Sequence, residues 1–257
     1  MITKQKSKGI QVRKVNGRKY LEVPHLDGRI SFAYSRQCGN YIQVAQRLNE
    51  VNLQQPTMAQ NASFLCAAWR KWIFPKEQPV IYYLRESPLW AFNGILYSRD
   101  KKGVFIQDRP NIVDGRVVMN SSELEGILSS REEDGVVYSE DGNVRFVSFG
   151  YKTGELSAKD LEKNPFTIAL AGKEGAQKLA RVSGNYERKP SLDDCGGGCI
   201  LLNQDEVEIV EGASLKTIRI RFDDGLCVKS SGLYDDRWSG YAFGVFKGLG
   251  EAKTQKT

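Results

Sequence analysis

Polar and hydrophobic residues alternate near the start of the chain and predict a pair of antiparallel strands. Residues 10–15 and 18–23 flank Asn16-Gly17, the dipeptide best suited to a two-residue type I′ turn. This turn would place Val12 opposite Leu21. Because side chains of a strand point alternately to its two faces, the apolar residues of both strands then share one face.

A third strand follows the same pattern. A turn at Asp27-Gly28 would pair Val23 with Phe32 and Leu21 with Tyr34. One buried side of the predicted meander then collects six residues, namely Ile10, Val12, Leu21, Val23, Phe32 and Tyr34.

Further along, capping residues and apolar spacing predict both helices and hairpins. The expected helices are 40–52, a segment from Thr57 (capped with Gln60) to Pro75, a short helix capped by Ser122 with Glu125, a turn opened by Ser157 and Asp160, and 173–182 closed by Gly184. The expected strands are 79–84, 89–98, 104–107, 136–139, 144–148, 200–203, 207–210, 215–222 and 226–229, with alternating aromatics and glycines over 238–246.

Local turns join most of these strands, which favours antiparallel sheets, since parallel strands need crossover connections. The order of elements predicts an α+β fold in which antiparallel sheets are built from consecutive β-hairpins and about five helices pack on them. Residues 183–199 are rich in Gly, Ser, Asp and Pro and mark a boundary. We expect an α+β domain over 1–184, a smaller β-rich domain or extension over 185–250, and a disordered tail over 251–257.

The charge is unevenly distributed along the 257 residues, whose formal net charge is +6. Residues 1–110 hold 18 Lys and Arg against 7 acids, whereas residues 111–165 hold 6 against 11. A basic part of this kind indicates an anionic partner, or else a contact with the acidic part of the same chain or of a neighbouring copy. No run of about 18 apolar residues predicts a membrane span, and the first residues lack the apolar core of a secretory signal. We therefore expect a cytoplasmic protein.

The first hairpin concentrates positive charge at its tip. Its register places Lys14 directly opposite Lys19, although like charges across a strand pair are destabilising. Two-stranded ribbons can enter a nucleic-acid groove. The candidate nucleic-acid-binding residues are Arg13, Lys14, Arg18 and Lys19.

Few residues in the chain point to catalysis. His25 is the only histidine, which excludes sites built from two histidines within this chain, and its place beside a hairpin turn favours a strand-end role. Cys195 and Cys199 enclose three glycines, a spacing compatible with zinc ligands, a redox pair or an ordinary glycine turn. The second ligand pair of a zinc site is missing, so neither a metal nor a cofactor is expected. Nucleotide-binding glycine fingerprints are absent from the sequence.

Three acidic pairs supply the alternative of an enzyme. Carboxylates at 193–194, 223–224 and 235–236 could hold a divalent ion for a hydrolase acting on a phosphate or sugar, if they converge in space. Turn chemistry also explains these pairs, because Asp and Gly suit turn dihedrals. Aromatic and basic residues interleave at 69–74 and 82–85, where core packing and base stacking are both open.

One short resemblance is present. Leu89-Trp-Ala-Phe-Asn-Gly94, followed by Gly103-Val-Phe-Ile-Gln-Asp108, resembles segments of uncharacterised archaeal proteins over about 20 residues. The resemblance implies an intracellular, prokaryotic-type protein and brings no activity with it. The sequence thus favours a non-enzymatic protein that binds nucleic acid or another polyanion, with the hydrolase and a self-associating assembly component as alternatives.

Overall fold

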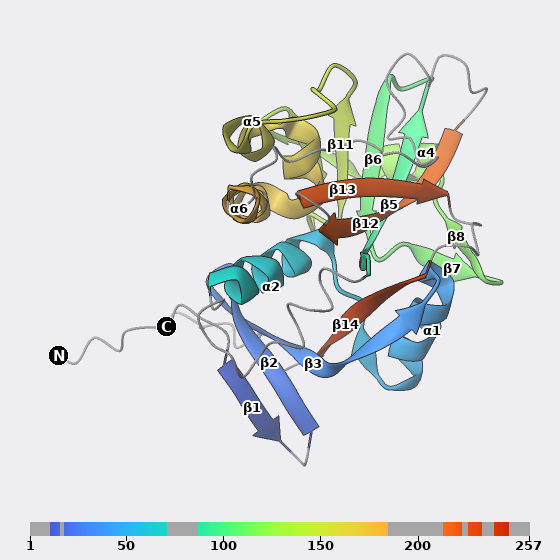
Figure 1. Cartoon of the computed structure of the whole chain (residues 1–257). Coiled ribbons are helices and arrows are strands. Elements are labelled where there is room, and N and C mark those ends of the chain that lie inside the picture. Colours follow the sequence, from blue (N-terminus) through green and yellow to red (C-terminus); the bar gives the residue numbers. More distant parts are fainter. Residues whose placement is uncertain are drawn as a thin grey trace, which may run out of the picture.

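The computed structural model describes residues 11–15, 18–70, 87–184, 213–222, 226–232 and 239–246. These residues form one large, mostly antiparallel sheet with helices on it, so the predicted α+β class is confirmed (Figure 1). The strand order along the sheet is β1-β2-β3-β14-β5-β6-β11-β10-β9. The strands of this path are β1 (Gln11–Val15), β2 (Arg18–His25), β3 (Gly28–Gly39), β14 (Gly240–Phe246), β5 (Leu89–Ser98), β6 (Gly103–Asp108), β11 (Val144–Ser148), β10 (Val136–Ser139) and β9 (Leu128–Glu133).

Three further strands join the sheet beside this path. β12 (Ala213–Phe222) pairs with β5 and with β13 (Leu226–Gly232), and β4 (Leu53–Gln54) pairs with β14. β7 (Asn111–Val113) and β8 (Arg116–Val118) form a separate two-stranded sheet. The strands β7, β8 and β9 were not expected, because they are short or carry mostly exposed polar residues.

The C-terminal strands do not stand apart from the rest of the sheet. β14 hydrogen-bonds between β3 and β5, and β12 hydrogen-bonds along β5. The predicted division at residue 184 stays a prediction, since the boundary residues 185–212, and with them the strands expected at 200–203 and 207–210, lie outside the described residues. The strand expected at 79–84 and the tail at 251–257 lie outside them too.

The first hairpin has the predicted register. Val12 pairs with Leu21 and Lys14 with Lys19, and Val15 pairs with Arg18, so two residues connect β1 to β2. The register predicted for the next hairpin was wrong by two residues, and its turn by one, because Leu21 pairs with Phe32 and Val23 with Ile30.

The second turn is made by Leu26 and Asp27, between the paired residues His25 and Gly28. Leu26 has a φ of 47°, a left-handed conformation that a sequence reading does not expect of leucine. A shift of two residues leaves every side chain on its predicted face, because the side-chain period of a strand is two.

Five helices lie within the described residues, and their capping explains where most of them begin. They are α1 (Tyr41–Glu50), α2 (Met58–Arg70), α4 (Ser121–Gly126), α5 (Ala158–Lys163) and α6 (Pro165–Ser183). Asn40 and Gln43 form a capping box on α1, and Thr57 with Gln60 does the same for α2. α5 is capped by Ser157, as predicted.

Two helix predictions need correction. Asn120, rather than Ser122, caps α4, because its side-chain oxygen accepts hydrogen bonds from the first free backbone N–H groups. α6 begins at Pro165, after its N-cap Asn164, instead of near residue 173, and it is broken at Gly172, whose φ is 71°. Its first half is almost entirely buried and apolar, so it lacks the one-sided spacing by which helices are recognised.

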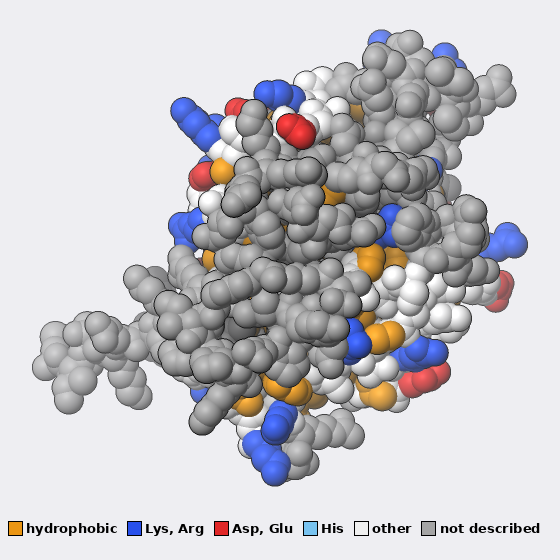
Figure 2. All heavy atoms as spheres, in the orientation of Figure 1, with side chains coloured by type: hydrophobic (Ala, Val, Ile, Leu, Met, Phe, Trp, Pro, Cys, Tyr) orange, Lys and Arg blue, Asp and Glu red, His pale blue; other side chains and the backbone are white. Residues whose placement is uncertain are grey.

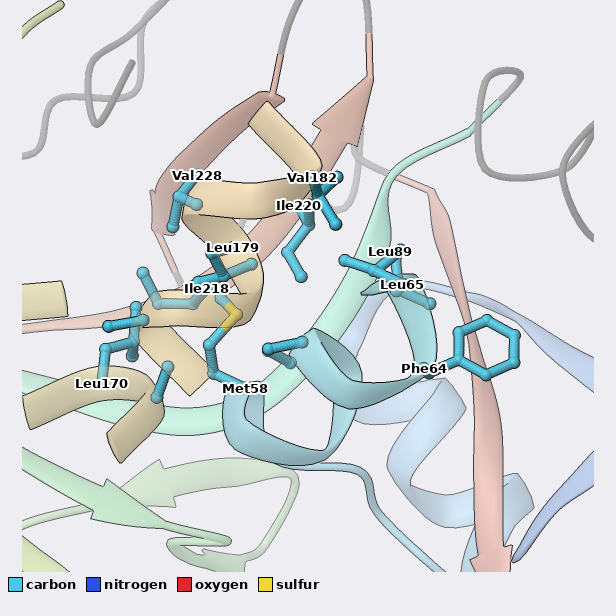
Figure 3. Packing of buried hydrophobic residues seen from close by; sticks show 14 of the residues in the cluster. Met58, Phe64, Leu65, Leu89, Leu170, Leu179, Val182, Ile218, Ile220 and Val228 are labelled. Atoms are coloured by element: carbon cyan, nitrogen blue, oxygen red, sulfur yellow. The ribbon is translucent and has the colours of Figure 1, made fainter. Parts of the chain in front are cut away.

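The hydrophobic core lies between the sheet and the helices. α2 and α6 pack together on one face of the sheet, while α1 packs with Trp90 and Phe92 of β5 in a second cluster. Figure 3 shows Met58 and Phe64 leaving α2 in different directions, Met58 toward α6 and Phe64 toward β14. No helix in the described part of the chain is long and apolar enough to cross a membrane.

Candidate functional site

A carboxylate of the protein itself neutralises part of the positive charge predicted for the tip of the first hairpin. Arg13 pairs with the protein's own Glu22 through an Nε–Oε2 distance of 2.9 Å, and Arg29 contacts the same carboxylate at 3.2 Å. The side chain of Arg18 lies outside the described part of the structure. Arg13 is therefore a weaker candidate for an external anion than the sequence alone indicated.

Lys14 and Lys19 differ from Arg13, because neither has an acidic partner among the described residues. Lys14 is exposed on β1 and faces Lys19 across the ladder, and within the described ranges no carboxylate pairs with either of them. Two ammonium groups held opposite each other repel, and a bound anion would relieve that repulsion. Figure 2 shows Lys and Arg side chains gathered over the tip of the β1–β2 hairpin, at the lower end of the view, close to hydrophobic side chains.

A cavity lies beside this lysine pair, and we name it the bulge cavity. Its volume is about 370 Å³. The lining residues are Lys19, Ala33, Tyr34, Ser35, Gln37, Val51, Leu53 and Phe246. The ammonium group of Lys19 lies 5.5 Å from the centre of the Tyr34 ring, a cation–π distance.

A β-bulge lies next to this cavity. Phe243 of β14 pairs with Arg36 of β3, but Val245 pairs with Phe32. One residue of β14, Gly244, thus stands opposite three residues of β3, Ala33 to Ser35. Bulges bend the strand that carries them and redirect its side chains, and they are frequent next to functional sites.

The sequence reading did not find the bulge cavity. Tyr34 was assigned to the buried face of the meander, and it does pack partly against the core. The extrapolated register of β2 and β3 places it beside Lys19, an aromatic ring next to a cation, but the wrong second turn hid this neighbour. Phe246 comes from the far end of the chain, and no local signal links it to this place.

The single histidine belongs to a second polar cluster. His25 ends β2, as expected, and its Nδ1 lies 2.8 Å from the Ser63 hydroxyl of α2, which also accepts a hydrogen bond of 2.8 Å from Lys178 of α6. Glu174 forms an ion pair with Lys178. Burial, and then the nearby Lys178 cation, lower the pKa of His25 to about 4.

This cluster fastens three elements together rather than exposing a nucleophile. Ser63 is only 2% exposed, so its hydroxyl is not accessible to a substrate. Because His25 comes from β2, Ser63 from α2, and Lys178 and Glu174 from α6, the cluster holds the base of the hairpin against the helices.

A third polar cluster lies deep in the sheet. Arg145 of β11 forms a two-pronged ion pair with Asp108 of β6, whose Oδ1 also accepts a hydrogen bond of 2.5 Å from the side-chain amide of Asn93. Asn93 accepts in turn from the backbone N–H of Met58 at the start of α2. The network thereby ties β5, β6 and β11 to α2.

A second cavity, of about 420 Å³, lies where β11 leads to α5 and α6. Lys152, Asp160 and Lys163 line it, and Lys152 pairs with Asp160 at 3.5 Å. The hydrogen bond from Ser157 and the Lys152 cation lower the pKa of Asp160. Asn164 caps the backbone N–H groups of Phe166 and Thr167 at the start of α6, so these donors are already engaged.

The predicted metal and carboxylate candidates are not brought together in what the structure describes. Cys195, Cys199 and the pairs 193–194, 223–224 and 235–236 all lie outside the described residues. Among those described, no three His, Cys, Asp or Glu side chains gather closely enough to hold a metal ion. The aromatic and basic segments at 71–74 and 82–85 also fall outside, as do the side chains of Trp69 and Arg70.

Comparison of the chain with models of protein families, with curated proteins and with solved structures gave no match.

Proposed function

We propose that this protein is a non-enzymatic binding protein whose N-terminal hairpin contacts nucleic acid. The observation that carries the proposal is the Lys14–Lys19 pair, two opposed cations without a carboxylate partner in the described residues. Phosphates spaced along a nucleic-acid strand supply repeated negative charge to such a pair. The excess of basic residues over 1–110 adds a favourable field at longer range.

Charges elsewhere in the molecule support nucleic acid over a second copy of the chain as the partner. The acidic edge strand β9 and its turn would be the natural contact for a basic hairpin. However, Lys173 already pairs with Asp134 at 2.9 Å, and Arg131 lies 3.6 Å from Glu133. Carboxylates that are neutralised within their own chain attract a neighbouring hairpin weakly.

The test is salt-dependent binding of a labelled single-stranded 20-mer and of its duplex, measured by fluorescence anisotropy. The double variant Lys14→Gln/Lys19→Gln should bind about tenfold more weakly. Its slope of log K against log salt should be shallower by about 1.4 for the single strand, or roughly 0.7 for each lost phosphate contact.

A matched control removes the same charge from another face of the protein. Lys159 and Lys163 are exposed on α5, and the variant Lys159→Gln/Lys163→Gln keeps the hairpin unchanged. This control should retain the wild-type slope of log K against log salt, because it lowers the net charge of the protein without removing a phosphate contact. Equal slopes for wild type and the hairpin variant, or no salt-sensitive binding of either probe, would contradict the proposal.

A further inference from the structure

We infer that the hairpin binds a single strand of nucleic acid with only one of its two faces, and that a base stacks there on Tyr34. We name this surface the tyrosine face and define it by Val12, Lys14, Lys19 and Tyr34. The inference rests on the proposed function and adds to it the binding surface and the form of the ligand.

The strand register puts the residues of the tyrosine face on the same side of the sheet. Lys14 pairs with Lys19 across β1 and β2. Leu21 pairs with Phe32 across β2 and β3. Because side chains alternate between the two faces of a strand, Tyr34 shares the side of Phe32, and Lys19 that of Leu21. The ammonium group of Lys19 accordingly lies 5.5 Å from the centre of the Tyr34 ring. Lys14, Lys19 and Tyr34 therefore form a row that crosses three strands.

This row is accessible, whereas the row next to it is covered by a helix. Lys14 and Lys19 are exposed, and Tyr34 is partly exposed. In the adjacent row Phe32 is fully buried, since the Phe64 ring of α2 packs on it with 5.0 Å between ring centroids. Helix α2 thus covers the row of Phe32, while the row at the hairpin tip keeps its contact with solvent.

The opposite face of the same strands is engaged by the protein itself. Arg13 lies on that face and pairs with Glu22 at 2.9 Å. The ring of Phe246 packs edge-on against Tyr20, with 4.1 Å between the ring centroids. Most of the lining of the bulge cavity also comes from that face, so the cavity and the Tyr34 ring do not receive the same ligand.

A lysine beside an aromatic ring matches the two repeating groups of a single strand, its phosphates and its bases. A base stacked on an aromatic side chain contributes about 5- to 150-fold in affinity. A cation over an exposed ring contributes only about 2- to 5-fold. A base can therefore replace Lys19 on the Tyr34 ring, and the displaced ammonium group then meets a neighbouring phosphate.

A second tyrosine with a cation over its ring lies in the opposite electrostatic surroundings. The guanidinium of Arg131 is 4.7 Å from the centre of the partly exposed Tyr138 ring on β10. Burial and the nearby carboxylate of Glu133 raise the pKa of Tyr138. The negative charge of Glu133 and Asp134 repels phosphates, so this pair is not expected to bind nucleic acid and supplies a matched control.

The tyrosine face discriminates between single strands and duplexes. In a duplex the bases are stacked on each other, so an intact duplex reaches the lysines but not the Tyr34 ring. A single strand offers its base faces directly. The protein should therefore prefer single strands and tolerate different bases, since every base has a face that can stack.

The experiment compares two single-stranded probes of equal charge, a 12-mer of deoxythymidine and a 12-mer of abasic tetrahydrofuran residues, by fluorescence anisotropy on the full chain. Wild type should bind the base-bearing probe at least about fivefold more tightly. Tyr34→Leu should bring this ratio close to one, and Tyr34→Phe, which keeps a ring, should preserve it. The control Tyr138→Leu should also preserve the wild-type ratio.

Two exposed valines test the choice of face without altering Tyr34. Val12→Glu places a carboxylate on the tyrosine face, two residues from Lys14, and should weaken the binding of both probes about tenfold. Val113→Glu adds the same charge at a similarly exposed position on β7 and should change binding by less than about twofold. Arg13→Gln removes a cation from the opposite face and should leave the salt slope unchanged. Near-ultraviolet circular dichroism confirms that each variant is folded.

The outcomes separate the two proposals. Equal affinity of wild type for the two probes, or a wild-type ratio in folded Tyr34→Leu, would overturn base stacking and leave phosphate binding by the hairpin standing. Equal losses in Val12→Glu and Val113→Glu would overturn the choice of face. If Tyr34→Leu does not fold, the wild-type ratio and the two valine variants decide. Failure of wild type to bind either probe would overturn both proposals.

Discussion

Two groups of charged residues in this molecule differ in whether their charges are neutralised by partners in the protein. In the interior, Arg145 is bound by Asp108, and Asn93 completes the network. At the hairpin tip, Lys14 and Lys19 face each other, with no carboxylate beside them in the described residues. A buried charge must be paired, since its desolvation is costly, whereas an exposed like-charge pair costs little and can persist for the sake of a ligand.

The largest expected effect is on the interior group. Asp108→Ala should lower the free energy of unfolding by about 3–5 kcal/mol, because it leaves the largely buried Arg145 without its partner and removes an acceptor from Asn93. Urea denaturation followed by circular dichroism measures the change. Glu125→Gln breaks the more exposed pair with Lys101 and should cost less than about 1 kcal/mol. Similar losses in the two variants would remove the contrast between buried and exposed charges.

The next effect concerns the base of the hairpin and depends on pH. The pKa of His25 is about 4 in the folded protein and about 6.5 in the unfolded chain, so the unfolded chain binds more protons between these values. The contribution of His25 to stability is fully present above pH 6.5 and is lost as the pH falls toward 4, by at most about 3.5 kcal/mol at roughly 1.4 kcal/mol per pKa unit.

The variant His25→Gln isolates this contribution, because glutamine does not titrate but can still hydrogen-bond to Ser63. Denaturation midpoints measured from pH 7 to pH 4 should fall less steeply in the variant than in wild type. Parallel curves would show that protonation of His25 does not couple to folding.

A smaller effect is expected where β14 faces the bulge. An added Cβ on Gly244 would lie 2.6 Å from Leu48 and 2.7 Å from Leu53, so Gly244→Ala should cost about 1–3 kcal/mol through overpacking. Gly126→Ala serves as the control, because nothing lies within 4 Å of its added Cβ and alanine favours the helix. A neutral Gly244→Ala would mean that the strands around the bulge adjust freely.

The smallest effect has the opposite sign. Lys14→Gln should raise the free energy of unfolding by about 0.2–0.5 kcal/mol, because it relieves the repulsion from Lys19 and leaves the contact between Lys19 and Tyr34 in place. The same variant should bind nucleic acid more weakly. Thermal denaturation and anisotropy on one protein preparation test both statements, and a variant that loses stability would show that Lys14 serves the fold.

Much of the local structure could be predicted from residues close together in the chain. Asn16-Gly17 predicted the register that places Lys14 opposite Lys19, and Asn40 and Ser157 marked the starts of α1 and α5. Turns and caps form between residues a few positions apart, so their chemistry can be recognised in the sequence.

Predictions failed where a distant contact decides the conformation. The turn at Leu26 has a left-handed leucine beside His25, which is held by Ser63 across 38 positions. The buried first half of α6 shows no one-sided pattern, because its surroundings are apolar on nearly every side.

The sequence by itself determined the α+β class, the first hairpin and the opposed lysines at its tip. Only the tertiary structure decided that Glu22 neutralises Arg13, and that the Phe246 ring packs against Tyr20 near the start of the chain. The physical reason is the distance along the sequence between the residues that interact. Hydrogen bonds of turns and caps are chosen locally, but the pairing of β14 with β3 joins residues about 200 positions apart and depends on how the whole core packs.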